Sequence, residues 1–560
     1  MQILTRLDET FKRAANAILR LDGVLLIALA LAFAFTLQGM NWGRVEDWNP
    51  DEVALRSLKK SLEPGTFTKP PFHMYLNRVV VLNWVHVLEQ IAQVQQKYFG
   101  SHDASYPMKI TFNAVALLGS RLLTLALFLG SVSLEFAIAR HFFGLVAARI
   151  TALLMATSAG FIACNHFLTA DSPMIFWMLL ALFFSQRILL SETLANYLLA
   201  GFFTGIATAT KYNALAVGLA IPVAHLLKSP SIKAAPLDRR PVLGVLMVLL
   251  GFVLACPYAI IDHRKFVADF MYNYTVTPHY GGQMTGHSYM DFLGRIPEII
   301  GWPGSAWVAL AILGALILVA LRKPPVRSIN GFLLAASVVT LYYVKIGSFS
   351  RMETRFVLPI VPLLLLMMGP ALEFCARKPI YILLMPVIIY NCISSYYVGI
   401  RFADDPRMAA QTWVRTHVAE GSAIESTQQC SDWNKLPGVH LDMRPAPNLN
   451  ERGALFSKIF SDNAWVLNKL AEKEGHVNEA DFTLDALQKR NPEYLAVDSR
   501  AYNGLQDGAA KAYYTSLLAG RYPYRIVFDL ESPPTPEWVY PRDIDFLQNR
   551  ITILQRLGKQ

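Results

Sequence analysis

The sequence is poor in cysteine and in charged residues, and each shortage excludes a class of protein. It has five cysteines in 560 residues, and only Cys430 lies outside the apolar stretches, so no disulfide can form within the polar C-terminal part. No cysteine and histidine cluster has the spacing of a metal site. Charged residues make up 16% and apolar residues 54% of the chain, with a mean hydropathy of +0.33. This composition predicts a polytopic membrane protein rather than a soluble globular one.

The formal charge of +10 is unevenly distributed. Residues 402–560 hold 18 basic and 21 acidic residues, a net −3, and the remainder of the chain holds 33 and 20, a net +13. A nucleic-acid-binding protein would carry its excess of basic residues on a soluble face. Here the excess lies in loops between apolar stretches, as topology and lipid phosphates require. We therefore expect a membrane partner and no nucleic acid.

Eleven apolar stretches are candidates to cross a bilayer core of ~30 Å, which requires about 20 mostly apolar helical residues. They cover about residues 21–39, 112–139, 144–163, 172–188, 195–210, 213–227, 241–260, 303–321, 329–345, 356–375 and 379–397. Several are short, and 195–227 also fits one broken hairpin. The basic residues of the short loops fall on one side, which predicts that this side, with the N-terminus, is cytoplasmic. An odd number of spans then places the C-terminal part outside.

The C-terminal part has the pattern of an α/β domain. Helices are predicted at Met408–Val418 and Ala509–Leu518, with strand-like runs at Ala423-Ile424, Tyr494–Val497 and Tyr524–Phe528. This alternation favours a partly parallel sheet. The predicted fold class is therefore mainly α: a membrane helical bundle over residues 1–400, with an external loop at 40–108, followed by an extracytoplasmic α/β domain over 401–560.

Two adjacent carboxylates, Asp51 and Glu52, follow the first span at the membrane edge. With Asn49 as N-cap and Pro50 at the first helical position, they would also make an ordinary helix start. Their location favours a chemical role, because transfer to an acceptor hydroxyl needs a carboxylate that takes the hydroxyl proton.

Basic residues on the same predicted side suit a phosphate group. Lys69 and Lys211 lie there against the trend of the short loops, although either could simply snorkel beside the membrane. Arg121 lies inside the second span, where an arginine is costly and usually faces a cavity or a partner. Arg355 ends the external loop Gly347–Arg355.

Three further candidates have strong alternative interpretations. Asp171 either caps the helix that follows it or contributes to a site. His279 and His287, in the external loop 262–302, are either interfacial residues or substrate contacts, and no carboxylate lies near enough in sequence to make them metal ligands. Acids and bases from at least five separated segments project to one side of the membrane, a convergence that helix capping does not require.

Six motifs in this order resemble a family of polytopic, lipid-carrier-dependent glycosyltransferases, the protein O-mannosyltransferases and the lipid A aminoarabinose transferases. The motifs are Asp51-Glu52, Lys69-Pro70-Pro71, Ser120-Arg121-Leu122, Leu168-Thr169-Ala170-Asp171, Thr210-Lys211-Tyr212 and Arg355-Phe356-Val357-Leu358-Pro359. The resemblance covers about residues 20–400.

The resemblance implies a GT-C fold in a bacterial inner membrane, with a polyprenyl-phosphate-linked sugar as donor and a lipid, glycan or protein as acceptor. Asp51 would be the base, Glu52 its neighbour, and Lys69, Arg121, Lys211 and Arg355 phosphate or sugar contacts. Asp171 would orient a basic neighbour or the sugar. Thr68 stands where the lipid A enzymes have a glutamate, which argues against their metal site and leaves a divalent metal cofactor as an open question. The tandem Trp-Trp-Asp of oligosaccharyltransferases is missing, which disfavours en bloc transfer to asparagine.

A transporter or flippase of a lipid-linked glycan is the alternative. Such a protein would place its polar site near the bilayer midplane, between related halves. The ionisable groups here cluster outward and no repeat is visible, so the sequence favours the enzyme.

Overall fold

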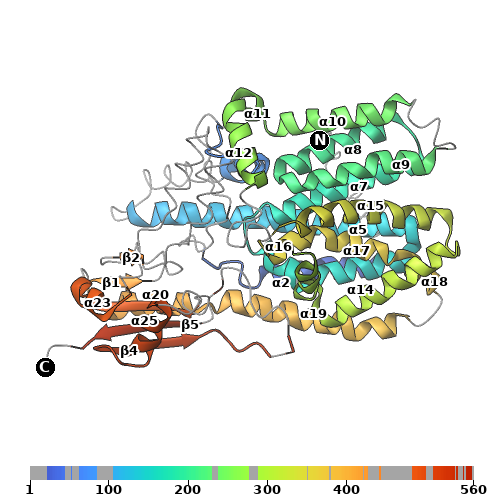
Figure 1. The fold of residues 1–560 in the computed structure, drawn as a ribbon. Helices are drawn as coiled ribbons and strands as arrows, with labels where there is room; N and C mark the ends of the chain where they lie inside the picture. The colour runs from blue at the N-terminus through green and yellow to red at the C-terminus, as the bar shows by residue number, and fades with distance from the viewer. Residues whose placement is uncertain are drawn as a thin grey trace, which may run out of the picture.

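The chain forms a helical bundle and, beyond one end of it, a smaller domain built on a β-sheet (Figure 1). The computed structural model describes residues 22–43, 52, 62–84, 105–229, 238–275, 288–349, 351–376, 380–419, 422–426, 440–442, 482–499, 509–536, 538–539, 547 and 550–557. The predicted fold class, a mainly α membrane bundle with a C-terminal α/β domain, is confirmed. The domain boundary at residue 400 stays a prediction.

The bundle is built from helices joined by short connections. In chain order these are α2 (Gly23–Leu37), α3 (Phe72–Asn77), η2 (Arg78–Leu82), α5 (Ser105–Ala156), α6 (Ala159–Asn165), α7 (Asp171–Leu190), α8 (Leu194–Thr210), η3 (Tyr212–Leu219), α9 (Ala220–Lys228), α10 (Arg239–Ala255), α11 (Tyr258–Ile261), α12 (His263–Thr275), α13 (Tyr289–Gly294), α14 (Ile296–Ala320), α15 (Val326–Gly347), α16 (Thr354–Val357), η6 (Leu358–Ile360), α17 (Val361–Met367), α18 (Gly369–Phe374) and α19 (Ile380–Ala403).

Each predicted span coincides with one helix or with consecutive helices. Among the described residues, six helical segments have the length and composition to cross a membrane, and three shorter apolar helices accompany them. The predicted break near residue 140 lies at Gly144, whose φ of 87° interrupts α5 in a conformation that glycine adopts readily. The observed helices outrun several predicted spans because hydropathy measures the apolar stretch rather than the helix. The total of eleven spans stays a prediction.

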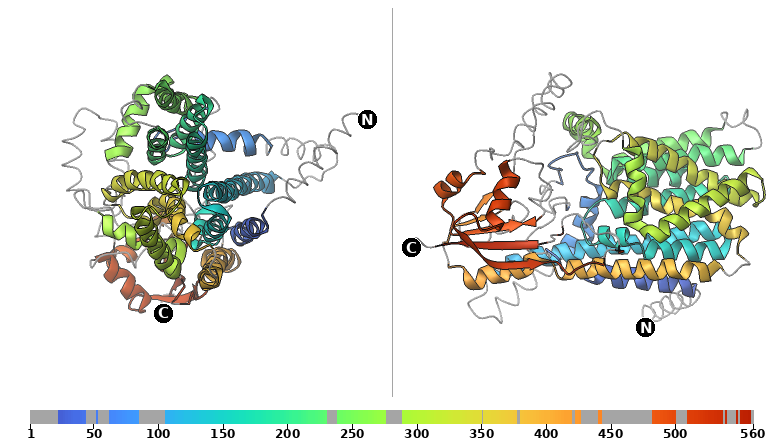
Figure 2. Two further views of the ribbon diagram at one scale, coloured as in Figure 1. Left: turned by 90° about the vertical axis from the view of Figure 1, so that its right-hand side faces the viewer. Right: turned by 60° about the horizontal axis from the view of Figure 1, so that its bottom comes forward.

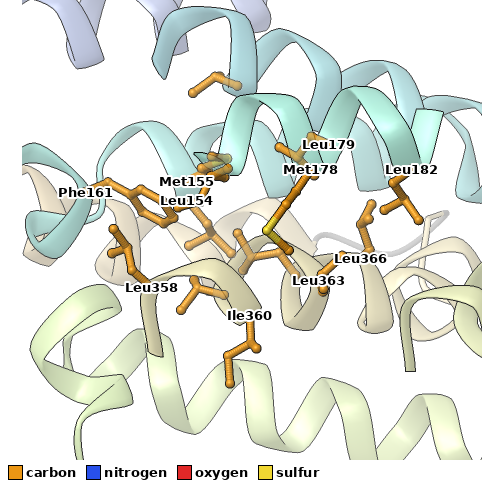
Figure 3. Close-up of a cluster of buried hydrophobic side chains, with 14 of the residues drawn as sticks. Leu154, Met155, Phe161, Met178, Leu179, Leu182, Leu358, Ile360, Leu363 and Leu366 are labelled. Atoms are coloured by element: carbon orange, nitrogen blue, oxygen red, sulfur yellow. The ribbon is translucent and has the colours of Figure 1, made fainter. Parts of the chain in front are cut away.

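The core of the bundle surrounds the segment from α16 to α18. Within this segment, 83% of the most apolar window is buried, the highest share among the six long spans. Figure 3 shows Leu358, Leu363 and Leu366 on the side that faces α5, α6 and α7, whereas Ile360 points to the opposite side. This packing places Arg355, at the start of the segment, over the end of the bundle core.

Helices α8 and α10 are in close contact because glycines line their interface. A Cβ on Gly201 would lie 1.9 Å from the carbonyl oxygen of Gly244, and one on Gly205 would lie 2.3 Å from that of Val248. Small residues four apart let membrane helices approach in this way. The contact fixes the end of α8, which carries Lys211 as its C-cap.

The C-terminal domain has a five-stranded sheet between helices. Its elements are α20 (Pro406–His417), β1 (Ile424–Ser426), β2 (His440–Asp442), α23 (Leu484–Arg490), β3 (Tyr494–Asp498), α25 (Ala509–Leu518), β4 (Tyr524–Glu531) and β5 (Arg550–Arg556). The strand order is β2-β1-β3-β5-β4, with β1 parallel to β2 and β3, and β5 antiparallel to β3 and β4. The predicted partly parallel sheet is confirmed, whereas β2, β5 and α23 were not predicted.

Alternating side chains of β3 pack against helices on both faces of this sheet. Tyr494 and Ala496 pack with α20, and Leu495 and Val497 pack with α23 and α25. Helix α20 also follows α19 directly, and Figure 2 shows the two running from the bundle to the sheet. A second connection is the Tyr390 hydroxyl of α19, which donates to the carbonyl oxygen of Trp538 at 2.7 Å.

The α8–α10 contact can be tested with Gly205→Ala. We expect this variant to lose about 1–3 kcal/mol of stability, because the added methyl group overpacks a backbone-to-backbone contact. The measurement is the thermal unfolding midpoint in detergent. Gly314→Ala in α14 is the matched control: its Cβ would lie 3.8 Å from the nearest atom, an ordinary contact, so its midpoint should not fall. Equal losses in the two variants would contradict the packing account.

Candidate active site

Arg121 and Glu52 form a buried ion pair, although the two residues lie far apart in the sequence. The Arg121 side chain is fully buried and the Glu52 side chain is 7% exposed. The arginine donates through Nε to Glu52 Oε1 at 2.9 Å and through Nη2 to Oε2 at 3.1 Å. This two-pronged geometry matches a planar guanidinium to a carboxylate.

The same guanidinium also holds the chain before the acid pair. Its Nη1 donates to the carbonyl oxygens of Met40, at 2.9 Å, and Trp42. Arg121 therefore ties down residues on both sides of the segment 43–51, by the backbone on one side and by Glu52 on the other. Asp51, the predicted base, lies outside the described residues.

Glu52 has a third donor in the connection between α6 and α7. The backbone N–H of Leu168 donates to Glu52 Oε1 at 2.9 Å. Leu168 is three residues before Asp171, so this contact links the acid pair to the second charged group of the site.

Asp171 and Lys211 are the centre of that second group. Asp171 begins α7 and its side chain is 4% exposed, whereas Lys211 ends α8 and is 23% exposed. The Lys211 ammonium donates to Asp171 Oδ1 and lies 5.6 Å from the ring centroid of Phe356. Asp171 has no capping hydrogen bond at the helix start in this structure, so its main partner is the lysine.

Lys69 and Arg355 both interact electrostatically with Asp171. Arg355 comes from α16, and its guanidinium donates to Glu353, which also accepts from Arg351. The structure thus brings together side chains from the segment before α3, from α7, from the end of α8 and from α16. These residues are far apart in the sequence, so tertiary packing is what brings them together.

Two hydrogen bonds explain why the loop that carries Lys69 lies beside Lys211. The hydroxyl of Tyr212, the neighbour of Lys211, donates to the carbonyl oxygen of Phe67 at 2.7 Å. The N–H of Phe67 donates to the buried carboxylate of Asp269 at 2.7 Å. Burial lowers the pKa of the nearby His73 to about 4, so this ring is neutral at neutral pH and adds no cation to the site.

Basic side chains are grouped at this place in the bundle. Lys69, Lys211, Arg351 and Arg355 lie here with the carboxylates of Asp171 and Glu353. Grouped lysine and arginine side chains suit an anionic ligand such as a phosphate group. Among the described residues, no three His, Cys, Asp or Glu side chains are grouped so that they could hold a metal ion.

The sequence analysis did not identify two residues of this region, Tyr342 and Trp42. Two others that it proposed, His279 and His287, are not tested by the structure. Tyr342 of α15 is buried and interacts electrostatically with Asp171. Trp42 is buried beside Arg121. Neither has a local signal, since an aromatic residue in or near an apolar span is common. His279 and His287 lie outside the described residues.

A family model matches the part of the chain that contains three of the six motifs. Residues 109–260, which contain Arg121, Asp171 and Lys211, match the model described as dolichyl-phosphate-mannose-protein mannosyltransferase. The resemblance to lipid-carrier-dependent membrane glycosyltransferases is thereby confirmed for this part of the chain. No curated protein matches the sequence.

Solved structures were also compared with the chain. ArnT from Cupriavidus metallidurans bound to undecaprenyl phosphate is 15% identical, with a TM-score of 0.48 over 96% of this chain and 99% of that one. The Archaeoglobus fulgidus oligosaccharyltransferase in complex with Zn and sulfate is 10% identical, with a TM-score of 0.43 over 85% and 68%. The S. cerevisiae Pmt1-Pmt2 complex bound to the sugar donor is 14% identical, with a TM-score of 0.30 over 44% and 34%.

The Arg121–Glu52 pair can be tested by removing one charge and then both. Arg121→Met should cost about 3–5 kcal/mol of stability, because it leaves the Glu52 carboxylate buried without its partner. The double variant Arg121→Met/Glu52→Gln should recover part of that loss, as measured by the unfolding midpoint in detergent. Arg327→Met is the control, since Arg327 is 53% exposed in its pair with Glu373 and such pairs contribute little. A double variant no more stable than Arg121→Met would refute the account.

Proposed function

We propose that this chain is a membrane glycosyltransferase that moves one sugar from a polyprenyl-phosphate donor to an acceptor hydroxyl at the outer face of the membrane. The family match over residues 109–260 supports sugar transfer from a lipid-linked donor. The observation that carries the proposal is the meeting of Lys69, Lys211 and Arg355 around Asp171. This cation-rich group lies at helix ends, where a donor held in the bilayer would present its phosphate.

The charge of the site fits the reaction better than it fits simple binding of the donor. A sugar phosphodiester carries one negative charge, and its phosphate gains a second as the bond to the sugar breaks. Lysine and arginine side chains fixed at the phosphate therefore interact more strongly with the leaving phosphate than with the intact donor. Stronger interaction in the transition state is what accelerates a reaction.

Asp51 and Glu52 have different roles in this mechanism. Both Glu52 oxygens accept hydrogen bonds, from the Arg121 guanidinium and the Leu168 N–H. Glu52 therefore positions the loop, and Asp51 is the base. As the acceptor oxygen attacks the anomeric carbon, its proton passes to the Asp51 carboxylate. The bond from the anomeric carbon to the phosphate oxygen breaks, and that electron pair leaves with the polyprenyl phosphate.

The remaining assignments complete the proposal. The protein is integral to a bacterial inner membrane, with the N-terminus in the cytoplasm and the C-terminal domain outside. The acceptor is a lipid, a glycan or a protein, and His279 and His287 contact substrate from the external loop. Lysine and arginine, rather than a metal clamp, neutralise the leaving phosphate.

Asp51→Asn should lower sugar transfer by about 10²- to 10⁴-fold with an unchanged unfolding midpoint, because the amide cannot take the acceptor proton. The assay follows a labelled sugar from a polyprenyl-phosphate donor to acceptor in detergent. Asp291→Asn, an exposed carboxylate of α13, is the matched control and should keep wild-type turnover. Near-normal turnover of Asp51→Asn would remove Asp51 from the mechanism. Wild-type protein without any transfer would point to a flippase.

A single displacement also predicts inversion at the anomeric carbon. The product of a donor with known anomeric configuration should show the opposite configuration in the one-bond C–H coupling constant measured by NMR. Retention would require two displacements and a covalent or dissociated intermediate, and would contradict the role given to Asp51.

A further inference from the structure

The start of α20 is held by a buried cluster that also contains part of the candidate active site. Asp405 caps α20: its Oδ1 accepts from the Arg407 N–H at 2.9 Å, and its Oδ2 accepts from Arg407 Nη2 at 2.7 Å. Oδ2 also accepts from Trp42 Nε1 at 2.8 Å. The Asp405 and Arg407 side chains are no more than 2% exposed. A helix cap in the C-terminal domain is thus bonded to a tryptophan of the bundle.

Trp42 contacts two guanidinium groups. The Arg407 guanidinium lies 5.1 Å from the indole centroid and that of Arg121 lies 5.8 Å from it, both within the range of cation–π attraction. The indole also meets Phe167 and Phe402 edge to face, with centroids 5.5 and 5.4 Å apart. Trp42 is therefore enclosed by its neighbours, with 1% of its surface exposed.

These contacts form a continuous path to the acid pair. The Trp42 side chain is bonded to Asp405, and the Trp42 carbonyl oxygen accepts from Arg121, whose guanidinium binds Glu52. A second branch runs through Phe167, which packs on Trp42 and directly precedes the residue whose N–H donates to Glu52. A displacement of Trp42 would therefore act on Glu52 from both sides.

The other end of the path is the sheet domain. Ala410 and Val414 of α20 pack against Tyr494, Ala496, Ile551 and Ile553 of the sheet. Because α20 is a single short helix that packs on the sheet, the sheet sets the position of its capped start. The path of bonds thus joins the sheet domain to the loop that carries the acid pair.

We propose that Trp42, Asp405 and Arg407 are positioning residues that set the Asp51–Glu52 pair relative to the C-terminal domain. The inference rests on the proposed function, because the rate that it affects is that of sugar transfer. None of the three side chains needs to touch substrate. Misplacement of a catalytic group by about 1 Å can lower the rate by about 10²-fold. The loss of a single hydrogen bond in this path is therefore expected to lower the rate of sugar transfer.

Trp42→Phe interrupts the path, because it keeps a buried aromatic ring but removes the N–H that donates to Asp405, together with part of the indole ring. We expect kcat to fall by about 10- to 100-fold per folded molecule, with the KM for donor changed by less than about twofold. Asp405→Asn keeps an oxygen acceptor for the indole and should retain more kcat than Asp405→Ala. Trp413→Phe makes the same substitution on the sheet-facing side of α20 and should keep wild-type kcat.

A second measurement is independent of activity. The Leu168 amide donates to Glu52, so hydrogen exchange resolved to Leu168 with overlapping peptides reports whether Glu52 is in place. We expect faster exchange at Leu168 in Trp42→Phe and Asp405→Ala and unchanged exchange in Trp413→Phe.

The outcomes separate this inference from the proposed function. A wild-type protein that transfers no sugar would overturn the proposed function, while faster exchange at Leu168 in Trp42→Phe would still support the positioning path. The inference would be overturned if Trp42→Phe and Asp405→Ala kept wild-type kcat and wild-type exchange at Leu168. A lower unfolding midpoint as the only change would give these residues a structural role.

Discussion

The buried pairing of Arg121 with Glu52 is the constraint on which the rest of the site depends. An arginine within a membrane helix is tolerated only when its charge and its donors are satisfied inside the protein. Arg121 meets this requirement with a carboxylate and two backbone carbonyls, which come from either side of the segment 43–51. The cost of burying the charge thus fixes Met40, Trp42 and Glu52 around Arg121, and the Leu168 N–H adds a further donor to Glu52.

The group of basic residues around Asp171 depends on a different feature: where along the bundle axis the helices begin and end. Asp171 starts α7, Lys211 follows α8, and Arg355 lies in α16 above the most buried segment of the bundle. Glycine contacts between α8 and α10 and the apolar core around Leu358 set these levels. Apolar packing therefore brings together polar groups that are far apart in the sequence.

The junction between α19 and α20 fixes the start of the C-terminal domain against the bundle. A tether alone would need only a linker, yet Asp405, Arg407 and Trp42 are bonded to each other and shielded from water. Three polar groups buried in this way fix an orientation, because each has lost its hydration and keeps its partners only in one geometry.

The sequence by itself determined the membrane class, the places of the apolar helices and the helix–strand alternation of residues 401–560, because hydropathy and periodicity are local properties. It also singled out Arg121, Asp171, Lys69, Lys211 and Arg355 as residues of unusual cost or placement. Only the tertiary structure decided which of these are partners: Glu52 takes Arg121, and Asp171 takes Lys211 rather than capping its helix. It alone revealed Trp42 between two guanidiniums and β5 as an inner strand between β3 and β4. These contacts join residues distant in sequence, so they depend on how whole helices and strands pack, which no local pattern records.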